Sequence, residues 1–361
     1  MRYGLALIGF GGVNRAVVDV MLRKKHMLRQ IAGLELVVVG VSDLRFGAAY
    51  QKSGLDLEAL SETPFEDGAL AGLPGGTRHA RNQEIILGPE IDIVVEATYT
   101  NPTTGQPALD HCRMSLTSGK HVVTTNKGPM ALAGRELLEV AAHHGVELKF
   151  EGTVMSGTPV IRLAQSALRG CEIRGFRGIL NGTSNFVLDR VAQGEAMDLA
   201  VKEAQRLGYA EADPTSDLDG FDVQLKVAIL ANLVLGADLR PAEILRVGIG
   251  DLTEERIREA SKRNRRWRLI GQAMRNDHDQ LEASVTPQLL ETSDPLASIS
   301  GPLNAITFDT DLLGLVTISG AGAGRTETAF AVLSDILEIH EGSTKPDRAT
   351  TAHPVVKQES A

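Results

Sequence analysis

Residues 3–15 read YGLALIGFGGVNR. Within them, Tyr3–Ile8 is almost entirely apolar, which is typical of a strand buried on both faces of a parallel sheet. The glycines that follow turn the chain into a helix predicted over Val13–Gln30. Leu34–Val41 predicts a second strand, which ends close to Asp43. A strand, a glycine turn, a helix, a strand and an acid in this order indicate a dinucleotide-binding unit.

The glycine turn supplies the first candidate binding residues. Gly9 permits the tight turn, and Gly11 lets the backbone approach a pyrophosphate at the helix N-terminus. The third position of the motif, usually Gly or Ala, is Asn14. Asp43 would bond the ribose hydroxyls and favour NAD, whereas Arg45 would meet the 2′-phosphate of NADP, so both cofactors stay open with a slight preference for NAD. The predicted cofactor-binding residues here are Gly9, Phe10, Gly11, Gly12, Val13, Asn14, Asp43 and Arg45.

Further strands alternate with helices up to about residue 150. Ile91–Ala97 and His121–Thr124 read as buried strands, and helices are predicted after each, while residues 44–88 read as polar and rich in turns. This alternation predicts an α/β fold with a doubly wound parallel sheet of the Rossmann type. We therefore expect a dinucleotide-binding domain over residues 1–150.

Two loops follow these strands at the edge where open α/β sheets bind ligands. The first contains Thr98 and Thr100, and the second contains Lys127 at a predicted helix start. A cation is disfavoured at a helix N-terminus, so an exposed lysine without a function is the less favoured interpretation at this position. We predict that Lys127 either clamps a carboxylate or organises a reacting carbonyl, and that all three residues lie near the cofactor.

The pattern changes after Glu151. Helices lead into an acidic segment, and then shorter strands alternate with turns, which predicts an α+β region over residues 151–319 with an open, largely antiparallel sheet. Residues 320–341 predict a glycine turn and a final helix that returns to the first domain. The polar residues 342–361 are predicted to be a disordered tail.

Composition excludes several classes of partner. The net charge of −9 argues against binding to nucleic acid or to an anionic membrane. No stretch approaches the roughly 20 apolar residues that a membrane span needs. Cys112 and Cys171 are too few for a disulfide framework or a metal site, so a reducing, cytoplasmic location is expected. The basic run over residues 262–268 is interpreted as a solvated helix end that leads into a strand.

The segment GYAEADPTSDLDGFDVQLK, residues 208–226, concentrates five carboxylates before a lysine. Asp222 and Lys226 are four residues apart and share a helix face if the apolar run that follows is a helix. A calcium loop is excluded, because Lys226 would occupy the position of the bidentate acid. A helix cap explains Asp217 or Asp219 alone. A pocket for a substrate ammonium explains more of the cluster, with Lys226 as proton donor or acceptor.

Two other segments each allow two interpretations. The turn EGTVMSGTP, residues 151–159, suits either a monovalent cation beside one carboxylate or a tight interdomain hinge. The helix start NGTSNF, residues 181–186, suits either a substrate carboxylate or a simple capped terminus.

At these motifs the chain resembles the homoserine dehydrogenases. The resemblance extends from the first strand to about residue 340 and rests on GFGGVNR, VVEATYTNPTTG, VVTTNKGP, EGTVMSGTP, GILNGTSNF, GYAEADPTSDLDGFDVQLKVAIL and GAGAGRTET. It implies NAD(P)-dependent interconversion of aspartate 4-semialdehyde and homoserine, in threonine and methionine biosynthesis. It also implies a Rossmann-type domain, a substrate and dimerisation domain over residues 151–319, and a homodimer or homotetramer.

The resemblance also implies roles for single residues. Lys226 would be the acid/base and Lys127 the second catalytic lysine, while Gly324 would lie near the nicotinamide. The substrate amino group would meet Glu211 and Asp222, with Asp217 in support, and its carboxylate would lie near Gly182 and Thr183. A monovalent cation, Na⁺ or K⁺, would be held by Glu151 and the carbonyls of Val154, Ser156 and Thr158. Asp219 is left as a helix cap, and Asp213 has no role.

Some expectations go against the family pattern or beyond it. Asn14 stands where many members have Gly, which puts the grip on the cofactor in question but not the fold. We expect neither the aspartate kinase nor the ACT domain of longer members, and hence no threonine feedback through such a domain. The alternatives are an oxidoreductase acting on another amino-acid semialdehyde, or a non-catalytic nucleotide-binding sensor.

Overall fold

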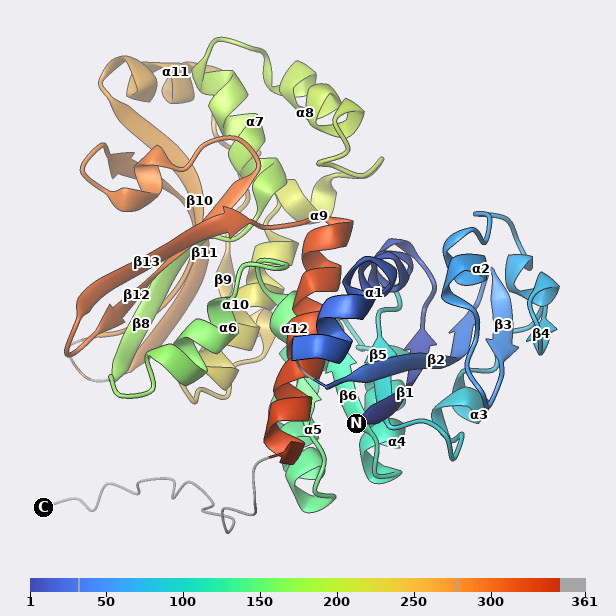
Figure 1. Cartoon of the computed structure of the whole chain (residues 1–361). Helices are drawn as coiled ribbons and strands as arrows, with labels where there is room; N and C mark the ends of the chain where they lie inside the picture. Colours follow the sequence, from blue (N-terminus) through green and yellow to red (C-terminus); the bar gives the residue numbers. More distant parts are fainter. Residues whose placement is uncertain (32, 277, 279, 345–361) are drawn as a thin grey trace, which may run out of the picture.

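The computed structural model describes residues 1–31, 33–276, 278 and 280–344, and these form two sheets with helices around each (Figure 1). This is the α/β architecture predicted from the sequence. None of the described helices is both long and apolar enough to cross a membrane.

The first sheet is parallel apart from one edge. Its strands are ordered β4-β3-β2-β1-β5-β6-β7, and only β3 and β4 run antiparallel to their neighbours. The order reverses beside β1, so the carboxyl ends of β1 and β5 meet there, where ligands of such sheets bind. The bounds are β1 Arg2–Ile8, β2 Glu35–Asp43, β3 Gly47–Tyr50, β4 Gly76–Thr77, β5 Ile93–Glu96, β6 His121–Thr124 and β7 Leu148–Lys149.

The antiparallel edge of this sheet was not predicted. Residues 44–88 form β3, β4, two short helices and a 3₁₀ turn, where the sequence indicated only polar turns. These strands are four and two residues long, too short for a periodic apolar pattern. Ala48 and Ala49 of β3 are nevertheless buried.

Helices cover the first sheet, and one of them comes from the far end of the chain. Figure 1 shows α12 beside α1, and Ala329, Val332 and Ile336 share a hydrophobic cluster with Val17 and Val18 of α1. The bounds are α1 Gly12–Ile31, α2 Leu57–Ser61, α3 Asn82–Ile86, α4 Ala108–Thr117, α5 Lys127–His143 and α12 Arg325–Thr344. Because α12 extends to Thr344, the rest of the predicted tail, residues 345–361, lies outside the described residues.

The second sheet is largely antiparallel, as predicted. Its order is β13-β12-β8-β10-β11-β9, and only the short β9 pairs in parallel. The strands are β8 Ile173–Ile179, β9 Leu245–Arg246, β10 Arg265–Arg275, β11 Leu281–Glu291, β12 Leu303–Thr310 and β13 Gly314–Ala321. The helices are α6 Val160–Arg162, α7 Gly182–Ala192, α8 Met197–Arg206, α9 Thr215–Leu218, α10 Phe221–Leu233 and α11 Glu254–Lys262.

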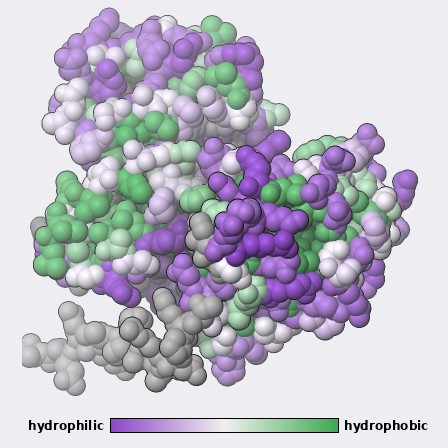
Figure 2. Space-filling model, viewed as in Figure 1, coloured by the Kyte–Doolittle hydropathy of each residue, from purple (hydrophilic) through white to green (hydrophobic). Residues whose placement is uncertain are grey.

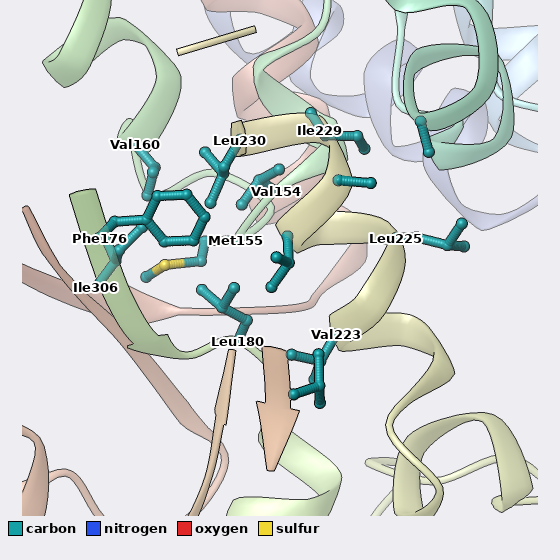
Figure 3. Close-up of a cluster of buried hydrophobic side chains, with 14 of the residues drawn as sticks. Val154, Met155, Val160, Phe176, Leu180, Val223, Leu225, Ile229, Leu230 and Ile306 are labelled. Carbon is teal, nitrogen blue, oxygen red and sulfur yellow. The ribbon is translucent and has the colours of Figure 1, made fainter. Parts of the chain in front are cut away.

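Helix α10 is the buried centre of the second half. Its residues 223–231 are almost all buried, so it needs apolar contacts on several sides. Figure 3 shows Leu230 on the side of Phe176, while Ile229 and Leu225 project from another side of the helix. This packing fixes the orientation of Asp222 and Lys226 at the start of the helix.

An exposed apolar area lies at the edge of the second sheet that β13 forms. Figure 2 shows hydrophobic residues gathered on the side where Figure 1 places β12 and β13. Leu312, Leu313 and Leu315, at the turn between these strands, are each more than half exposed. The edge strand β13 therefore presents both apolar side chains and open backbone groups.

A buried ion pair ties β10 to α7. Arg268 is 2% exposed, and its Nη1 donates to Asp189 Oδ1 at 2.7 Å. Its Nη2 donates to the carbonyl oxygen of Ile299, and Asp189 Oδ2 accepts from the amide of Gly301. Burial lowers the pKa of Arg268 while Asp189 opposes that shift, so each charge depends on the other.

We expect Asp189→Ala to lower the free energy of unfolding by about 3–5 kcal/mol, because it leaves the Arg268 guanidinium buried without a counter-charge. Glu195→Ala is the matched control, since its partner Arg190 is 41% exposed, and it should cost less than about 1 kcal/mol. Urea unfolding of both variants measures the difference. Equal losses would contradict the prediction.

Candidate active site

The glycine turn leaves room for a ligand at the N-terminus of α1. Gly9 has φ 82°, and a Cβ built on it would lie 2.7 Å from the carbonyl oxygen of Ala97, so the turn requires glycine. Apart from its own chain neighbours, no atom of the described residues lies within 4 Å of a Cβ built on Gly11. The amides of Gly12 and Val13 begin the helix beside this open volume. The volume, the amides and the helix dipole together suit a pyrophosphate.

Asn14 explains why the departure from the glycine motif does not disturb the fold. The side chain is fully buried, and its Nδ2 donates to the carbonyl oxygens of Gly9 at 2.6 Å and Ile8 at 3.3 Å. The Asn14 side chain thus supplies hydrogen-bond donors to the carbonyls at the end of β1. A glycine at this position has no side chain and would leave these carbonyls to other partners. The aromatic ring of Phe10 is also fully buried, so only its backbone is available to a cofactor.

Asp43 is bound to the glycine turn and to the residues that follow it. Its Oδ2 accepts from the amide of Phe10 at 2.7 Å, and its Oδ1 accepts from the amides of Arg45 and Phe46. The side chain of Arg45 forms an ion pair with Asp67 at 2.5 Å. Asp43 therefore holds the end of β2 against the turn, and its Oδ2, which accepts a single bond, keeps lone-pair capacity for a ribose hydroxyl.

Thr98 and Lys127 are joined through Asn126. Asn126 caps α5 by accepting from the amide of Gly128, and its Nδ2 donates to the carbonyl oxygens of Thr98 and Tyr99. Lys127 is the first residue of α5, directly after this cap. Thr100, partly exposed, lies in the same loop as Thr98.

Gly324 also lies close to the turn. It precedes α12, whose residue Arg325 reaches to within 2.9 Å of a Cβ built on Gly12. The start of α12 and the Thr98 loop thus both lie against the glycine turn.

One carboxylate connects the two predicted catalytic lysines. Lys226 is 6% exposed, and its Nζ donates to Asp222 Oδ2 and to the carbonyl oxygen of Leu180, both at 2.6 Å. Lys127 Nζ lies 3.4 Å from Asp222 Oδ1. Burial alone would raise the pKa of Asp222, but the two ammonium groups outweigh burial and hold that pKa well below its usual range. Asp222 therefore stays ionised between two positive charges.

Asn181 holds the acidic residues together, and sequence reasoning did not assign it this role. It caps α7 by accepting from the amide of Ser184, and its Nδ2 donates to Asp217 at 2.7 Å and to Asp222 at 3.1 Å. Burial and the neighbouring Asp222 raise the pKa of Asp217. Its place at the head of the NGTSNF motif was the available clue, but its partners lie far along the chain.

The substrate residues predicted at α7 lie next to this group. Gly182 and Thr183 are the first residues of α7, and Thr183 Oγ1 donates to the carbonyl oxygen of Tyr209 at 2.8 Å. This bond holds the start of the acidic segment, at Tyr209, against α7.

Three of the five acids of residues 208–226 lie outside the group that Asn181 forms with Asp217 and Asp222. The side chain of Glu211 is exposed on a loop whose backbone oxygen accepts from Gln205. Asp213 bonds the amide of Thr215. The expectation that Asp219 caps the helix is wrong, because α10 begins after Gly220, which takes the N-cap position in a left-handed conformation without any side-chain bond.

The Glu151 segment is buried and bound to α12. Glu151 accepts from the amides of Ile161 and Arg162 at 2.9 and 2.8 Å, and burial raises its pKa. Ser156 Oγ lies 2.7 Å from Thr328 Oγ1, and Thr158 Oγ1 donates to the carbonyl oxygen of Ala321.

The hinge and cation interpretations of this segment are both compatible with these contacts. Val154, three residues after Glu151, is fully buried. Its carbonyl remains a predicted cation ligand together with those of Ser156 and Thr158. Among the described residues, no group of three or more His, Cys, Asp or Glu is arranged to hold a metal ion.

Comparison with known proteins identifies the family of this chain. The family model described as "Homoserine dehydrogenase, NAD binding domain" matches residues 9–151, and "Homoserine dehydrogenase" matches residues 159–337. The chain belongs to the homoserine dehydrogenase family. It is therefore an NAD(P)-dependent oxidoreductase acting on a small molecule.

Individual relatives cover nearly the whole chain. The NAD(+)-dependent homoserine dehydrogenase of Pseudomonas canavaninivorans is 52% identical over 97% of this chain and 99% of its own length. The homoserine dehydrogenase of Methanocaldococcus jannaschii is 38% identical over 94% of this chain and 99% of its own. A solved hyperthermophilic archaeal homoserine dehydrogenase in complex with NADPH has a TM-score of 0.80 and 30% identity, with 95% of this chain and 98% of that one covered.

The two glycines of the turn should respond differently to substitution. Gly9→Ala should destabilise the fold by at least about 1–2 kcal/mol, because of its positive φ and the contact with Ala97. Gly11→Val should change stability by less than about 1 kcal/mol. It should weaken nucleotide binding by about tenfold or more, which corresponds to about 1.4 kcal/mol. Fluorescence titration with NADH and thermal unfolding measure both; wild-type affinity in Gly11→Val would place the pyrophosphate elsewhere.

Asp222→Asn should destabilise the protein in a pH-dependent way. A carboxyl whose folded pKa is lowered stabilises the fold above its unfolded pKa of about 3.9, and that contribution is lost as pH falls through the folded value. The variant should therefore lose about 3 kcal/mol at pH 7, with the difference from wild type shrinking below about pH 4. Urea unfolding at several pH values tests this. Exposed Asp251→Asn is the control, and a difference independent of pH would contradict the assignment.

Proposed function

We propose that this chain interconverts aspartate 4-semialdehyde and homoserine with Lys226 as acid/base. The observation that carries the proposal is the single carboxylate of Asp222 between Lys226 and Lys127. A bound nicotinamide nucleotide supplies or accepts the hydride at the substrate carbon. The protein must then hold the substrate oxygen and give it a proton in reduction, or remove that proton in oxidation.

Lys226 is suited to the proton transfer. Its ammonium has three N–H donors, and two of them point to Asp222 and to the carbonyl oxygen of Leu180. The third donor is left for the substrate oxygen. The fixed partners orient this donor before the substrate arrives, which reduces the reorganisation that proton transfer requires.

Lys127 supplies a second positive charge near the reacting oxygen. It is the first residue of α5, and the Asn126 cap ties that helix start to the loop containing Thr98. Its ammonium polarises and positions the carbonyl of the substrate, and Asp222 keeps it turned toward α10.

The acidic group is suited to the substrate ammonium. Asp217 and Asp222 are close enough for Asn181 to bond both, and their repulsion helps to raise the pKa of Asp217. A cation beside them would relieve this repulsion. We propose that the amino group lies against Asp222 with Asp217 in support, and that Glu211 reaches it from the exposed loop on which it lies. The carboxylate would meet Gly182 and Thr183 at the start of α7.

The cofactor is proposed to be NAD, with NADP as the alternative. Arg45, the candidate for a 2′-phosphate, is already paired with Asp67, and Asp43 is placed at the end of β2. A relative with 52% identity is named as NAD(+)-dependent. A monovalent cation at Glu151, Val154, Ser156 and Thr158 is part of the same proposal and rests on the family motif.

We also propose the organisation of the chain. Residues 1–150 with 320–341 would form the nucleotide domain, and residues 151–319 the substrate and dimerisation domain. The two family models also meet near residue 150, and the packing of α12 against α1 supports the assignment of residues 320–341, although the second model extends to residue 337. The exposed leucines at the start of β13 and in the turn before it favour a homodimer or homotetramer. Two free cysteines, Cys112 and Cys171, favour the cytoplasm.

The test is an assay of the wild type and two lysine variants with homoserine and either NAD⁺ or NADP⁺. Lys226→Met should lower kcat by about a hundredfold or more while nucleotide binding persists. Lys202→Met is a matched control, because Lys202 forms an i, i+4 pair with Asp198 on the exposed face of α8. Activity of Lys226→Met within a few-fold of wild type would remove Lys226 from this role.

The same assay separates the alternatives. Turnover of a different semialdehyde, without homoserine-dependent reduction of NAD⁺ or NADP⁺, would indicate a related oxidoreductase. Nucleotide binding without any turnover would indicate a sensor.

A further inference from the structure

Glu96 is a fully buried carboxylate that the proposed mechanism does not use. It is the last residue of β5, in register with Ile8 of β1 and Thr124 of β6. Burying a carboxylate is costly unless it is well hydrogen-bonded, and an apolar side chain would suit this position in a parallel sheet better. Glu96 therefore has a role other than packing.

The contacts of Glu96 point toward the cofactor edge. Its Oε1 accepts from the amide of Thr98 at 3.2 Å and from the hydroxyl of the same residue. Its Oε2 lies 3.4 Å from Thr124 Oγ1, and His111 Nδ1 lies 3.5 Å from Oε1. Two consecutive elements of the candidate site, the Thr98 loop and the end of β6, thus share this carboxylate.

A chain of hydrogen bonds fixes the tautomer of His111. The amide of Arg81 donates to Ser42 Oγ at 2.8 Å, and the Ser42 hydroxyl donates to Asn82 Oδ1 at 2.5 Å. Asn82 Nδ2 therefore faces His111 Nε2, 3.0 Å away, as a donor. In a neutral ring, Nε2 must then accept and Nδ1 must carry the proton. Nδ1 lies 3.5 Å from Glu96 Oε1 without a hydrogen bond to any described residue.

The loop held by Glu96 separates the two halves of the catalytic apparatus. On one side, the Cα of Thr98 lies 2.9 Å from a Cβ built on Gly9, so the loop lies directly against the glycine turn. On the other side, the carbonyl oxygens of Thr98 and Tyr99 accept from Asn126, the cap of the helix that begins with Lys127. A displacement of Thr98 would move both the glycine turn, where the nucleotide is expected, and Lys127.

We propose that Glu96 is a positioning residue for hydride transfer. Its carboxylate, bonded to the amide and hydroxyl of Thr98, holds this residue so that the nucleotide bound at the glycine turn and Lys127 meet at one substrate carbon. This inference rests on the proposed function but concerns a different residue. A misplacement of about 1 Å between reacting groups can cost about a hundredfold in rate, so a small shift of this loop is sufficient.

The test compares Glu96→Val and Glu96→Gln with Val94→Ala. Val94 lies two residues earlier on the same face of β5 and is fully buried, so its variant reports the effect of disturbing the strand alone. Glu96→Val should lower kcat by about a hundredfold. Glu96→Gln keeps an oxygen acceptor for Thr98 but loses the charge, so it should lower kcat by about tenfold.

Stability distinguishes positioning from a structural role. Glu96→Val removes a buried charge and should unfold at a temperature no lower than Val94→Ala, although it is far less active. A purely structural role would lower the thermal midpoint and leave kcat per folded molecule unchanged. If Glu96→Val does not fold, Glu96→Gln decides the question, and a kcat within about twofold of wild type overturns the proposal.

Titration with NADH keeps this proposal separate from the proposed function. Wild-type protein without homoserine-dependent activity would refute the proposed function. In that case weaker NADH binding by Glu96→Val than by Val94→Ala would still support the role of Glu96 in placing the cofactor loop. Equal NADH affinities of these two variants together with equal kcat values would overturn it.

Discussion

The carboxylate of Asp222 is the interaction on which the candidate site depends. It accepts from Lys226 on its own helix and faces Lys127 on α5, which belongs to the other sheet. Without this anion, two ammonium groups would lie close together in a largely buried region, where their repulsion is weakly screened. The charge balance of the site therefore also links the two halves of the molecule.

The surrounding structure keeps this carboxylate ionised and correctly oriented. Asn181 bonds both Asp222 and Asp217, and its side-chain oxygen caps α7. The apolar packing of α10 fixes the angle from which Lys226 enters the site. Neutral hydrogen bonds and hydrophobic packing thus prepare a group of charges that would not be stable by themselves.

The sequence predicts the parts of the fold that are long and periodic. The strands β1, β2, β5 and β6 are recognisable as apolar runs, and the four-residue spacing of Asp222 and Lys226 predicts their contact. The short strands β3 and β4 carry no such pattern. The role of Asn181 could not be predicted either, because its partners lie 36 and 41 residues away and only the folded chain brings them together.

The position of α12 has a consequence for synthesis on the ribosome. The apolar face of α1 packs against Ala329, Val332 and Ile336, which are among the last described residues to be translated. The first sheet therefore cannot bury that face while the intervening residues are being made. Domains that emerge first usually fold first, but here the N-terminal unit stays partly open until α12, about 300 residues after α1, has left the exit tunnel.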